Sequence, residues 1–169
     1  WQLSQAATLM RSSTPIVAAQ MEYSLVERGI EREVVPAAKV HNIGITAWSP
    51  LGRGVLTGKY RHSPPPDSRG ASAHFAGFVN NYQDQQSRRI VEALATAAEG
   101  LGLPMLSVAL SWVLGQPQVA SAIIGARTAA QLRGALATEP VELPPAIVSA
   151  LADVSLPYRG YPEYGWNQG

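Results

Sequence analysis

Three short apolar segments, each followed by a stretch with helical spacing, constrain the fold of this chain more than any other feature. They span residues 16–20, 43–48 and 119–124, and apolar side chains run through them without regular polar alternation. Such segments predict strands buried on both faces, which is typical of parallel sheets. Repeated strand–helix alternation therefore predicts an α/β fold with a parallel sheet and right-handed crossovers, either an open doubly wound sheet or a (β/α)8 barrel.

Helical periodicity and end signals predict the remaining elements. Helices are expected over residues 1–12, 30–42, 85–99, 105–114, 129–137 and 145–154. Pro104 precedes one of them in a first-turn position, and Thr128 can cap another through its hydroxyl. Residues 49–84 show no periodicity and are rich in glycine and proline, and loops of this length inside a compact domain are often functional. Residues 155–169 form an irregular tail.

Composition limits the class of protein. Hydrophobic residues make up 46% of the chain and charged residues 15%, which is ample for a buried core. The net charge of +1 gives no sign of a nucleic-acid or membrane partner. The chain has no cysteine, which fits a reducing cytoplasm. Because position 1 is Trp1 and lies inside a predicted helix, we expect residues 1–169 to be one part of a single larger domain.

Polar or glycine-rich residues follow each of the three predicted strands. They are Gln20, the segment 48–52 that begins with Trp48, and the segment 125–128 that contains Arg127. Because the carboxyl ends of parallel strands meet at one edge of the sheet, we expect these segments to lie together where α/β proteins bind ligands. A glycine-rich turn at a helix start, with an arginine beside it, suits a phosphate group.

Each of these features also has an ordinary structural interpretation. The turn at 125–128 is as compatible with an ordinary strand–helix connection, in which Arg127 is solvated, as it is with a phosphate site. Residues 49–60 carry three glycines and several cations, but Tyr60 stands where a P-loop requires serine or threonine, and a surface loop has the same composition. Trp48 could stack on a ligand ring or belong to the core, and Gln20 could bind a carboxamide or the backbone.

The sequence shows a candidate binding edge without a candidate catalytic group. His41 lies in the last turn of a predicted helix, where a cation favours the helix dipole. His62 and His74 have no second ligand at metal spacing, and no nucleophile motif is present. We therefore assign no catalytic residue and no metal site to this chain.

The three segments at the predicted strand ends resemble the aldo-keto reductase family in order and spacing, most closely the bacterial reductases related to potassium-channel beta subunits. The resemblance rests on residues 20–25 (QMEYSL), 48–60 (WSPLGRGVLTGKY) and 124–132 (IGARTAAQL) and covers the chain to about Val154. It implies that the chain is the C-terminal portion, the last three βα units, of a (β/α)8 barrel. The family's Tyr, Asp, Lys and His tetrad is expected in an N-terminal half that this chain does not contain.

The resemblance also implies a set of residues that bind NADPH. Gln20 is expected to hold the nicotinamide carboxamide, and Trp48 to stack on the nicotinamide ring. A loop over the pyrophosphate is expected from Ser49, Pro50, Leu51, Gly52 and Arg53, assisted by Lys59 and Arg69. The 2′-phosphate and adenine are expected at Gly125, Ala126, Arg127, Thr128 and Gln131. Many relatives carry Glu-Asn where this chain has Gly134 and Ala135, so it departs from the family at the adenine end.

These expectations lead to an oxidoreductase that reduces aldehydes or ketones to alcohols with NADPH, in the cytoplasm, with this chain inactive on its own. Its partners are expected to be a small carbonyl substrate and either its own N-terminal half or another copy, because a three-stranded piece leaves sheet edges unpaired. The alternatives are a non-catalytic NADPH-binding regulatory or partner-docking protein, and an inactive truncated fragment.

Overall fold

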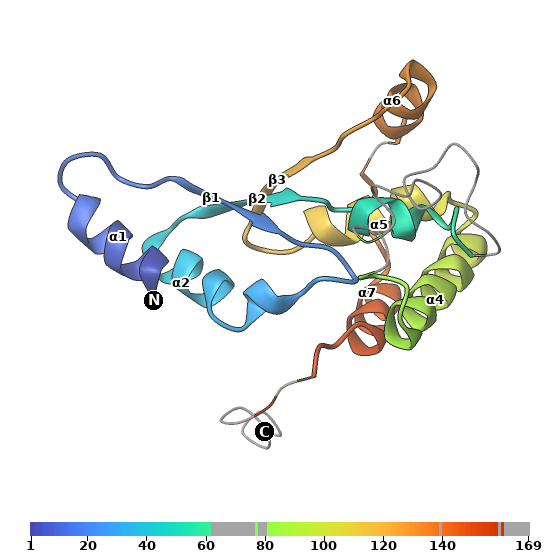
Figure 1. Ribbon diagram of the computed structural model, residues 1–169, viewed down its shortest axis with the longest axis horizontal. Helices are drawn as coiled ribbons and strands as arrows, with labels where there is room; N and C mark the ends of the chain where they lie inside the picture. Colours follow the sequence, from blue (N-terminus) through green and yellow to red (C-terminus); the bar gives the residue numbers. More distant parts are fainter. Residues whose placement is uncertain (62–76, 78–80, 139, 159, 161–169) are drawn as a thin grey trace.

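A parallel three-stranded sheet lies at the centre of the computed structural model of this chain (Figure 1), which describes residues 1–61, 77, 81–138, 140–158 and 160. The strands are β1 (Ala18–Glu22), β2 (Gly44–Trp48) and β3 (Val119–Ile123), in the order β1-β2-β3. Both pairs are parallel. The predicted α/β fold with a parallel sheet is confirmed, while the position of these strands as the last three of eight stays a prediction.

The helices agree with those predicted from periodicity to within two residues at each end, except that α2 begins at Val34 and not at residue 30. They are α1 (Gln2–Met10), α2 (Val34–His41), α4 (Gln85–Leu101), α5 (Met105–Leu114), α6 (Ala129–Leu136) and α7 (Pro145–Val154). Local end signals explain several boundaries. The Asp84 carboxylate accepts a 2.6 Å hydrogen bond from the Ser87 backbone N–H at the start of α4. Asn42 and Gly102 adopt left-handed conformations after α2 and α4.

Two predictions about the limits of the strands and loops were wrong. The first strand covers Ala18–Glu22 rather than residues 16–20, because its pairing with β2 runs from Ala18 opposite Gly44 to Glu22 opposite Trp48. Gln20 therefore lies in the middle of a strand and not at its end. Residues 49–84 are not structureless throughout, since a short 3-10 segment, η2 (Gly52–Thr57), follows β2. A second 3-10 turn, η1 (Gly29–Glu31), precedes α2.

The two faces of the sheet differ in burial. Ala19, Ile45 and Ala47 point to one face and are buried, where they contribute to the hydrophobic core. Residues at the alternate positions point to the opposite face, and there Gln20 is exposed and Trp48 is half-buried. The prediction that all three strands are buried on both faces is therefore wrong for the described structure. Gln20 and Trp48 share the more open face.

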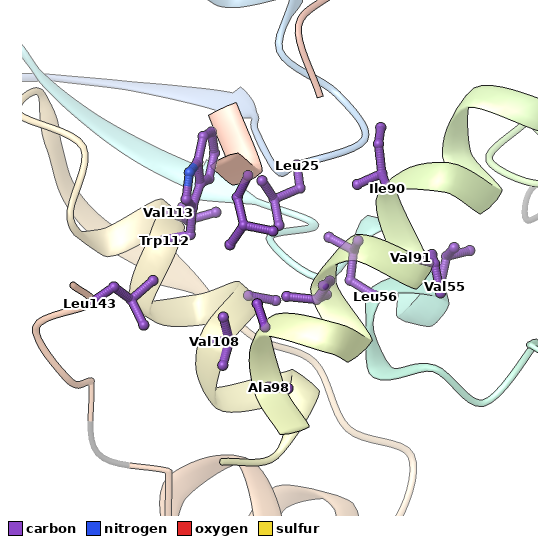
Figure 2. Close-up of a cluster of buried hydrophobic side chains, with 14 of the residues drawn as sticks. Leu25, Val55, Leu56, Ile90, Val91, Ala98, Val108, Trp112, Val113 and Leu143 are labelled. Atoms are coloured by element: carbon purple, nitrogen blue, oxygen red, sulfur yellow. The ribbon is translucent and has the colours of Figure 1, made fainter. Parts of the chain in front are cut away.

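The core positions the segment that follows β2. Figure 2 shows Val55 and Leu56 from η2 packed among side chains of α4 and α5, including Val91, Val108 and Trp112. Leu56 and Val108 are fully buried. A smaller cluster joins α1 and α2 to β1 and β2. Burial of this apolar surface is the dominant stabilising term, and it fixes η2 firmly against the helices.

A buried arginine joins distant parts of the chain. One Arg28 guanidinium nitrogen donates to the backbone oxygen of Ala152 at 2.6 Å and to the Ser155 hydroxyl at 2.8 Å. Its Nε donates to the Glu31 carboxylate at 2.8 Å, and its guanidinium lies 5.2 Å from the Trp112 ring centroid. This network connects the segment after β1 to the end of α7.

Within the described part of the chain, no single helix is both long and apolar enough to cross a membrane. The pair α4 and α5 passes that test only when taken together, with a bend of 102° between them. Both helices supply buried residues to the core.

Candidate ligand-binding site

A cavity of about 730 Å³ lies beside the ends of β2 and β3. Its size falls within the range of roughly 300–1,000 Å³ that is typical of small-molecule sites. We call residues 49–54 the β2 loop and residues 124–128 the β3 turn. The lining comes from these two connections, the end of η2 and the faces of α5 and α6: Trp48, Ser49, Pro50, Leu51, Arg53, Gly54, Thr57, Lys59, Pro104, Leu106, Ile123, Ile124, Gly125, Ala126, Arg127, Gln131, Gly134, Ala135 and Thr138.

Trp48 forms one wall of the cavity. It is the last residue of β2, paired in register with Glu22 on β1 and with Ile123 on β3. It is half-buried and lies outside both clusters of buried core residues formed by the described chain. Of the two interpretations left open by the sequence, an exposed platform agrees better with this position than a core role. An indole at a strand end offers a flat apolar surface with a polar N–H.

The β2 loop has an unusual backbone. Ser49, Gly52, Arg53 and Gly54 all have positive φ, at 50°, 53°, 57° and 94°. This conformation is costly for non-glycine residues and is found most often at functional sites, where the surrounding structure maintains it. Here the maintaining contacts include a 2.9 Å hydrogen bond from the Gly54 N–H to the Leu51 oxygen. The loop therefore has a defined conformation, held by its own hydrogen bonds, at the cavity wall.

Glycine is required at position 52 on two grounds. A Cβ there would lie 2.5 Å from Cγ2 of Val26, and the residue has a left-handed φ of 53°. Gly54 is close to a cation, because a Cβ on it would lie 2.8 Å from Nζ of Lys59. The Lys59 ammonium also lies 5.0 Å from the Tyr60 ring centroid. The absence of a side chain at Gly54 thus leaves room for an ammonium at the cavity wall.

The β3 turn is held by the side chains that begin α6. The Thr128 hydroxyl accepts a 3.2 Å hydrogen bond from the Gln131 N–H, and the Gln131 side-chain oxygen accepts one of 2.9 Å from the Arg127 N–H. These reciprocal bonds resemble a capping box and fix the start of the helix. Arg127 is exposed and lines the cavity. Figure 1 shows α6 standing apart beyond β3, and none of its eight residues is buried.

An ion pair joins Arg53 of the β2 loop to Glu22 of β1. The Arg53 guanidinium contacts the Glu22 carboxylate at 3.2 Å and lies 5.0 Å from the Tyr82 ring centroid. The side chains of Arg53 and Glu22 are only 11% and 17% exposed, so the pair is largely removed from water. Burial raises the pKa of the Tyr82 phenol above its ordinary value, and the neighbouring Glu22 carboxylate raises it further. Tyr82 is therefore neutral at physiological pH.

The structure brings together ten of the residues that the sequence predicted for a binding site. The ones that line the cavity are Trp48, Ser49, Pro50, Leu51, Arg53, Lys59, Gly125, Ala126, Arg127 and Gln131. Among the described residues, Gln20, Gly52 and Thr128 lie outside the lining. Arg69 lies outside the described part of the chain. The binding roles of all these residues remain predictions.

Sequence reasoning missed part of the lining and the groups behind it. Gly134 and Ala135, named from the sequence only as a departure from relatives at the adenine end, lie three and four positions after Gln131 in α6, and Thr138 follows the end of that helix. Helical spacing from Gln131 could have identified them. Glu22 and Tyr82 could not be found in this way, because their contact with Arg53 joins three segments distant in sequence.

The model of the Aldo/keto reductase family matches residues 1–155 of this chain. The chain belongs to this family. An oxidoreductase of Bacillus subtilis, YrpG, whose name describes it as uncharacterized, is 35% identical over 156 residues, which are 91% of this chain and 45% of that protein. A probable voltage-gated potassium channel subunit beta of Arabidopsis thaliana is 38% identical over 121 residues, 70% of this chain and 37% of that protein. Protein tas of Escherichia coli is 32% identical over 147 residues, 87% of this chain and 42% of that protein.

These comparisons confirm the resemblance read from the sequence, both to the aldo/keto reductases and to channel beta subunits among them. The chain spans less than half the length of each of these three relatives. The activity, substrates and partners of a whole family member are therefore proposals for this chain.

Proposed function

We propose that the cavity between the β2 loop and the β3 turn holds NADPH, and that the chain is the cofactor-binding part of an oxidoreductase that reduces aldehydes or ketones to alcohols. The observation that carries the proposal is the make-up of the cavity wall. An indole, a left-handed loop and two cations, Lys59 and Arg127, come from separate segments and line one volume. Dinucleotide cofactors need these features: a surface for a ring and positive charge for phosphates.

The residues present fit the cofactor. A volume of about 730 Å³ is large enough for an extended ligand of many atoms. Trp48 would support the nicotinamide ring, and the backbone of the β2 loop together with Lys59 would face the pyrophosphate. Arg127 would neutralise the 2′-phosphate that distinguishes NADPH from NADH, since a guanidinium suits phosphate geometry. Gln20 shares the open sheet face with Trp48 and would contact the carboxamide.

The chemistry is divided between the cofactor and the protein. NADPH supplies the hydride when it is bound, and the residues of this chain bind and orient it. Positioning of this kind lowers the barrier because the reacting groups no longer have to find each other. The proton donor is proposed to lie outside this chain, in the N-terminal part expected from the resemblance. We therefore expect this chain alone to bind NADPH without consuming it.

A titration with NADPH and NADH tests the proposal. Binding of NADPH to the chain is expected to quench indole fluorescence, with NADPH bound roughly tenfold to a hundredfold more tightly than NADH because one charge-assisted contact is worth about 1.5–3 kcal/mol. A chain that remains folded by circular dichroism and shows no quenching up to millimolar NADPH would overturn the assignment.

A non-catalytic binding role is the second candidate. It is favoured by the identity of 38% to a protein named as a probable channel subunit beta. In that role NADPH occupancy would regulate a partner instead of driving turnover. The two functions separate when the whole protein is assayed with NADPH and a generic aromatic aldehyde. NADPH consumption supports the reductase, whereas tight binding without consumption supports the regulatory role.

A further inference from the structure

We propose that Glu22 is a positioning residue of the cavity: its carboxylate holds the Arg53 guanidinium against the Tyr82 ring and thereby keeps the β2 loop in its left-handed conformation. This inference rests on the proposed binding of NADPH in the cavity. It gives a role to Glu22 and Tyr82, neither of which lines the described cavity wall.

The backbone of the β2 loop needs such a restraint. Arg53 has a left-handed φ of 57°, which a residue with a side chain adopts only when its surroundings impose it. The neighbouring glycines adopt positive φ at no comparable cost. Two contacts of the described structure reach Arg53 from outside the loop: its 3.2 Å ion pair with Glu22 and its stacking over the Tyr82 ring. Anchoring the long arginine side chain therefore fixes the strained non-glycine residue that lies between Gly52 and Gly54.

Three separate segments meet at the arginine. Glu22 is the last residue of β1 and is paired in register with Trp48, so its backbone is fixed beside that of the residue that forms the platform. Tyr82 is buried and packs in the cluster that includes Val55 and Leu56 of η2. The Arg53 guanidinium lies 5.0 Å from the Tyr82 ring centroid, a distance at which the ring face attracts a cation. Strand, loop and core are thus connected through one side chain.

The ion pair also decides where the positive charge of the cavity lies. The Arg53 side chain is 11% exposed and the Glu22 side chain 17%, so the opposite charges face each other out of water. The pair is close to neutral as seen from the cavity. Lys59 and Arg127 are both exposed and line the cavity, so within the described residues they place positive charge at its surface. We infer that Arg53 shapes the wall through this ion pair and does not serve as a main phosphate contact.

The competing interpretation, a direct phosphate contact by Arg53, makes the opposite prediction for Glu22. If Arg53 acted on the ligand, removing the Glu22 charge would free the guanidinium and tighten binding. If Glu22 positions the loop, the same change releases Arg53 from its restraint and weakens binding. The sign of the change in affinity therefore separates the two.

The test uses the whole 169-residue chain and measures the NADPH dissociation constant for Glu22→Gln, Glu22→Asp, Arg53→Gln and the double variant Glu22→Gln/Arg53→Gln. We expect Glu22→Gln and Arg53→Gln each to weaken binding about tenfold, and Glu22→Asp to recover part of the loss because it keeps the charge. The double variant is expected to lose no more than either single variant, since both remove the same restraint. Glu92→Gln is the matched control, because it removes the acid of an exposed ion pair with Arg61 and should not change the dissociation constant.

The salt dependence of binding adds a readout that separates a direct phosphate contact by Arg53 from a positioning role. Lys59→Gln should make the dissociation constant less sensitive to salt, since it removes a proposed phosphate contact, whereas Arg53→Gln should leave that sensitivity unchanged. Tighter binding in Glu22→Gln, additive losses in the double variant, or a reduced salt sensitivity in Arg53→Gln would each overturn the inference. So would variants whose melting temperature falls while NADPH affinity stays at the wild-type value. Absence of NADPH binding in the wild type would instead refute the proposed function.

Discussion

At the scale of single residues, Trp48 carries the largest contact proposed for the ligand. Replacing Trp48 by alanine should weaken NADPH binding roughly tenfold to a hundredfold, because a stacked ring is worth about 1–3 kcal/mol. Trp48→Phe should retain most of the affinity, since it keeps an aromatic face. Isothermal titration calorimetry of the three chains checks both. Equal affinity in the alanine variant would show that the indole does not support the ligand.

Arg127 is the residue proposed to select NADPH over NADH. Arg127→Gln should weaken NADPH binding roughly tenfold, by about 1.5 kcal/mol, and leave the affinity for NADH nearly unchanged. The matched control is Arg133→Gln, which removes the same charge from an exposed position on α6 outside the cavity lining. A selectivity that falls equally in both variants would indicate a general effect of net charge.

The sequence predicted which residues line the cavity better than it predicted the contacts that hold those residues in place. The lining residues of the segments that begin at Trp48 and at Gly125 could be anticipated because each segment follows a strand directly, and parallel strands bring their ends together. The contacts of Arg53 with Glu22 and Tyr82 depend on how the β2 loop folds back. No local pattern encodes that geometry. The resemblance therefore implied a phosphate role for Arg53 and gave no sign of its contacts with Glu22 and Tyr82.

At the scale of elements, the β2 loop and η2 depend on Gly52. Gly52→Ala places a Cβ 2.5 Å from Val26 at a left-handed φ, so we expect a loss of about 1–3 kcal/mol in the free energy of unfolding. Gly100→Ala is the control, because a Cβ there meets no described heavy atom within 4 Å and the residue lies in α4. That change should be neutral or stabilise the helix by up to about 1 kcal/mol. Urea unfolding of both variants measures the free energy of unfolding. A similar loss in Gly52→Ala and Gly100→Ala would contradict the predicted clash at position 52.

The secondary structure was largely predictable from the sequence, with informative exceptions. The ends of α4 and α6 could be located because Asp84 and Thr128 are caps whose bonds are local. The limits of β1 could not, because its register with β2 sets them and the apolar run begins two residues before the strand. The prediction that both faces of each strand are buried was wrong, because burial depends on which other elements cover the sheet, and an apolar run does not specify them.

At the scale of the whole molecule, Arg28 connects the segment after β1 with α7 and the core. Arg28→Met removes the buried guanidinium and leaves Glu31 and the oxygens of Ala152 and Ser155 without its hydrogen bonds. Loss of one partner of a buried ion pair costs about 3–5 kcal/mol. We therefore expect a fall of roughly 6–20 °C in the melting temperature, whereas Arg11→Met, at an exposed position after α1, should have little effect.

The stability readout is differential scanning calorimetry at pH 7. For a domain of this size, 1 kcal/mol corresponds to a shift of roughly 2–4 °C in the melting temperature. A shift of less than 2 °C for Arg28→Met would show that the network adds little to the fold. Because Arg28 lies far from the cavity lining in sequence and outside it in space, NADPH affinity measured well below the transition should be unchanged.

The central claim concerns one volume, the cavity between the β2 loop and the β3 turn, as the place where a dinucleotide lies. A crystal structure of the chain grown with NADPH tests it most directly. We predict electron density for the nicotinamide ring against the Trp48 indole and for the 2′-phosphate within hydrogen-bonding distance of Arg127. Density for NADPH elsewhere on the molecule, with this cavity filled only by water, would contradict the account.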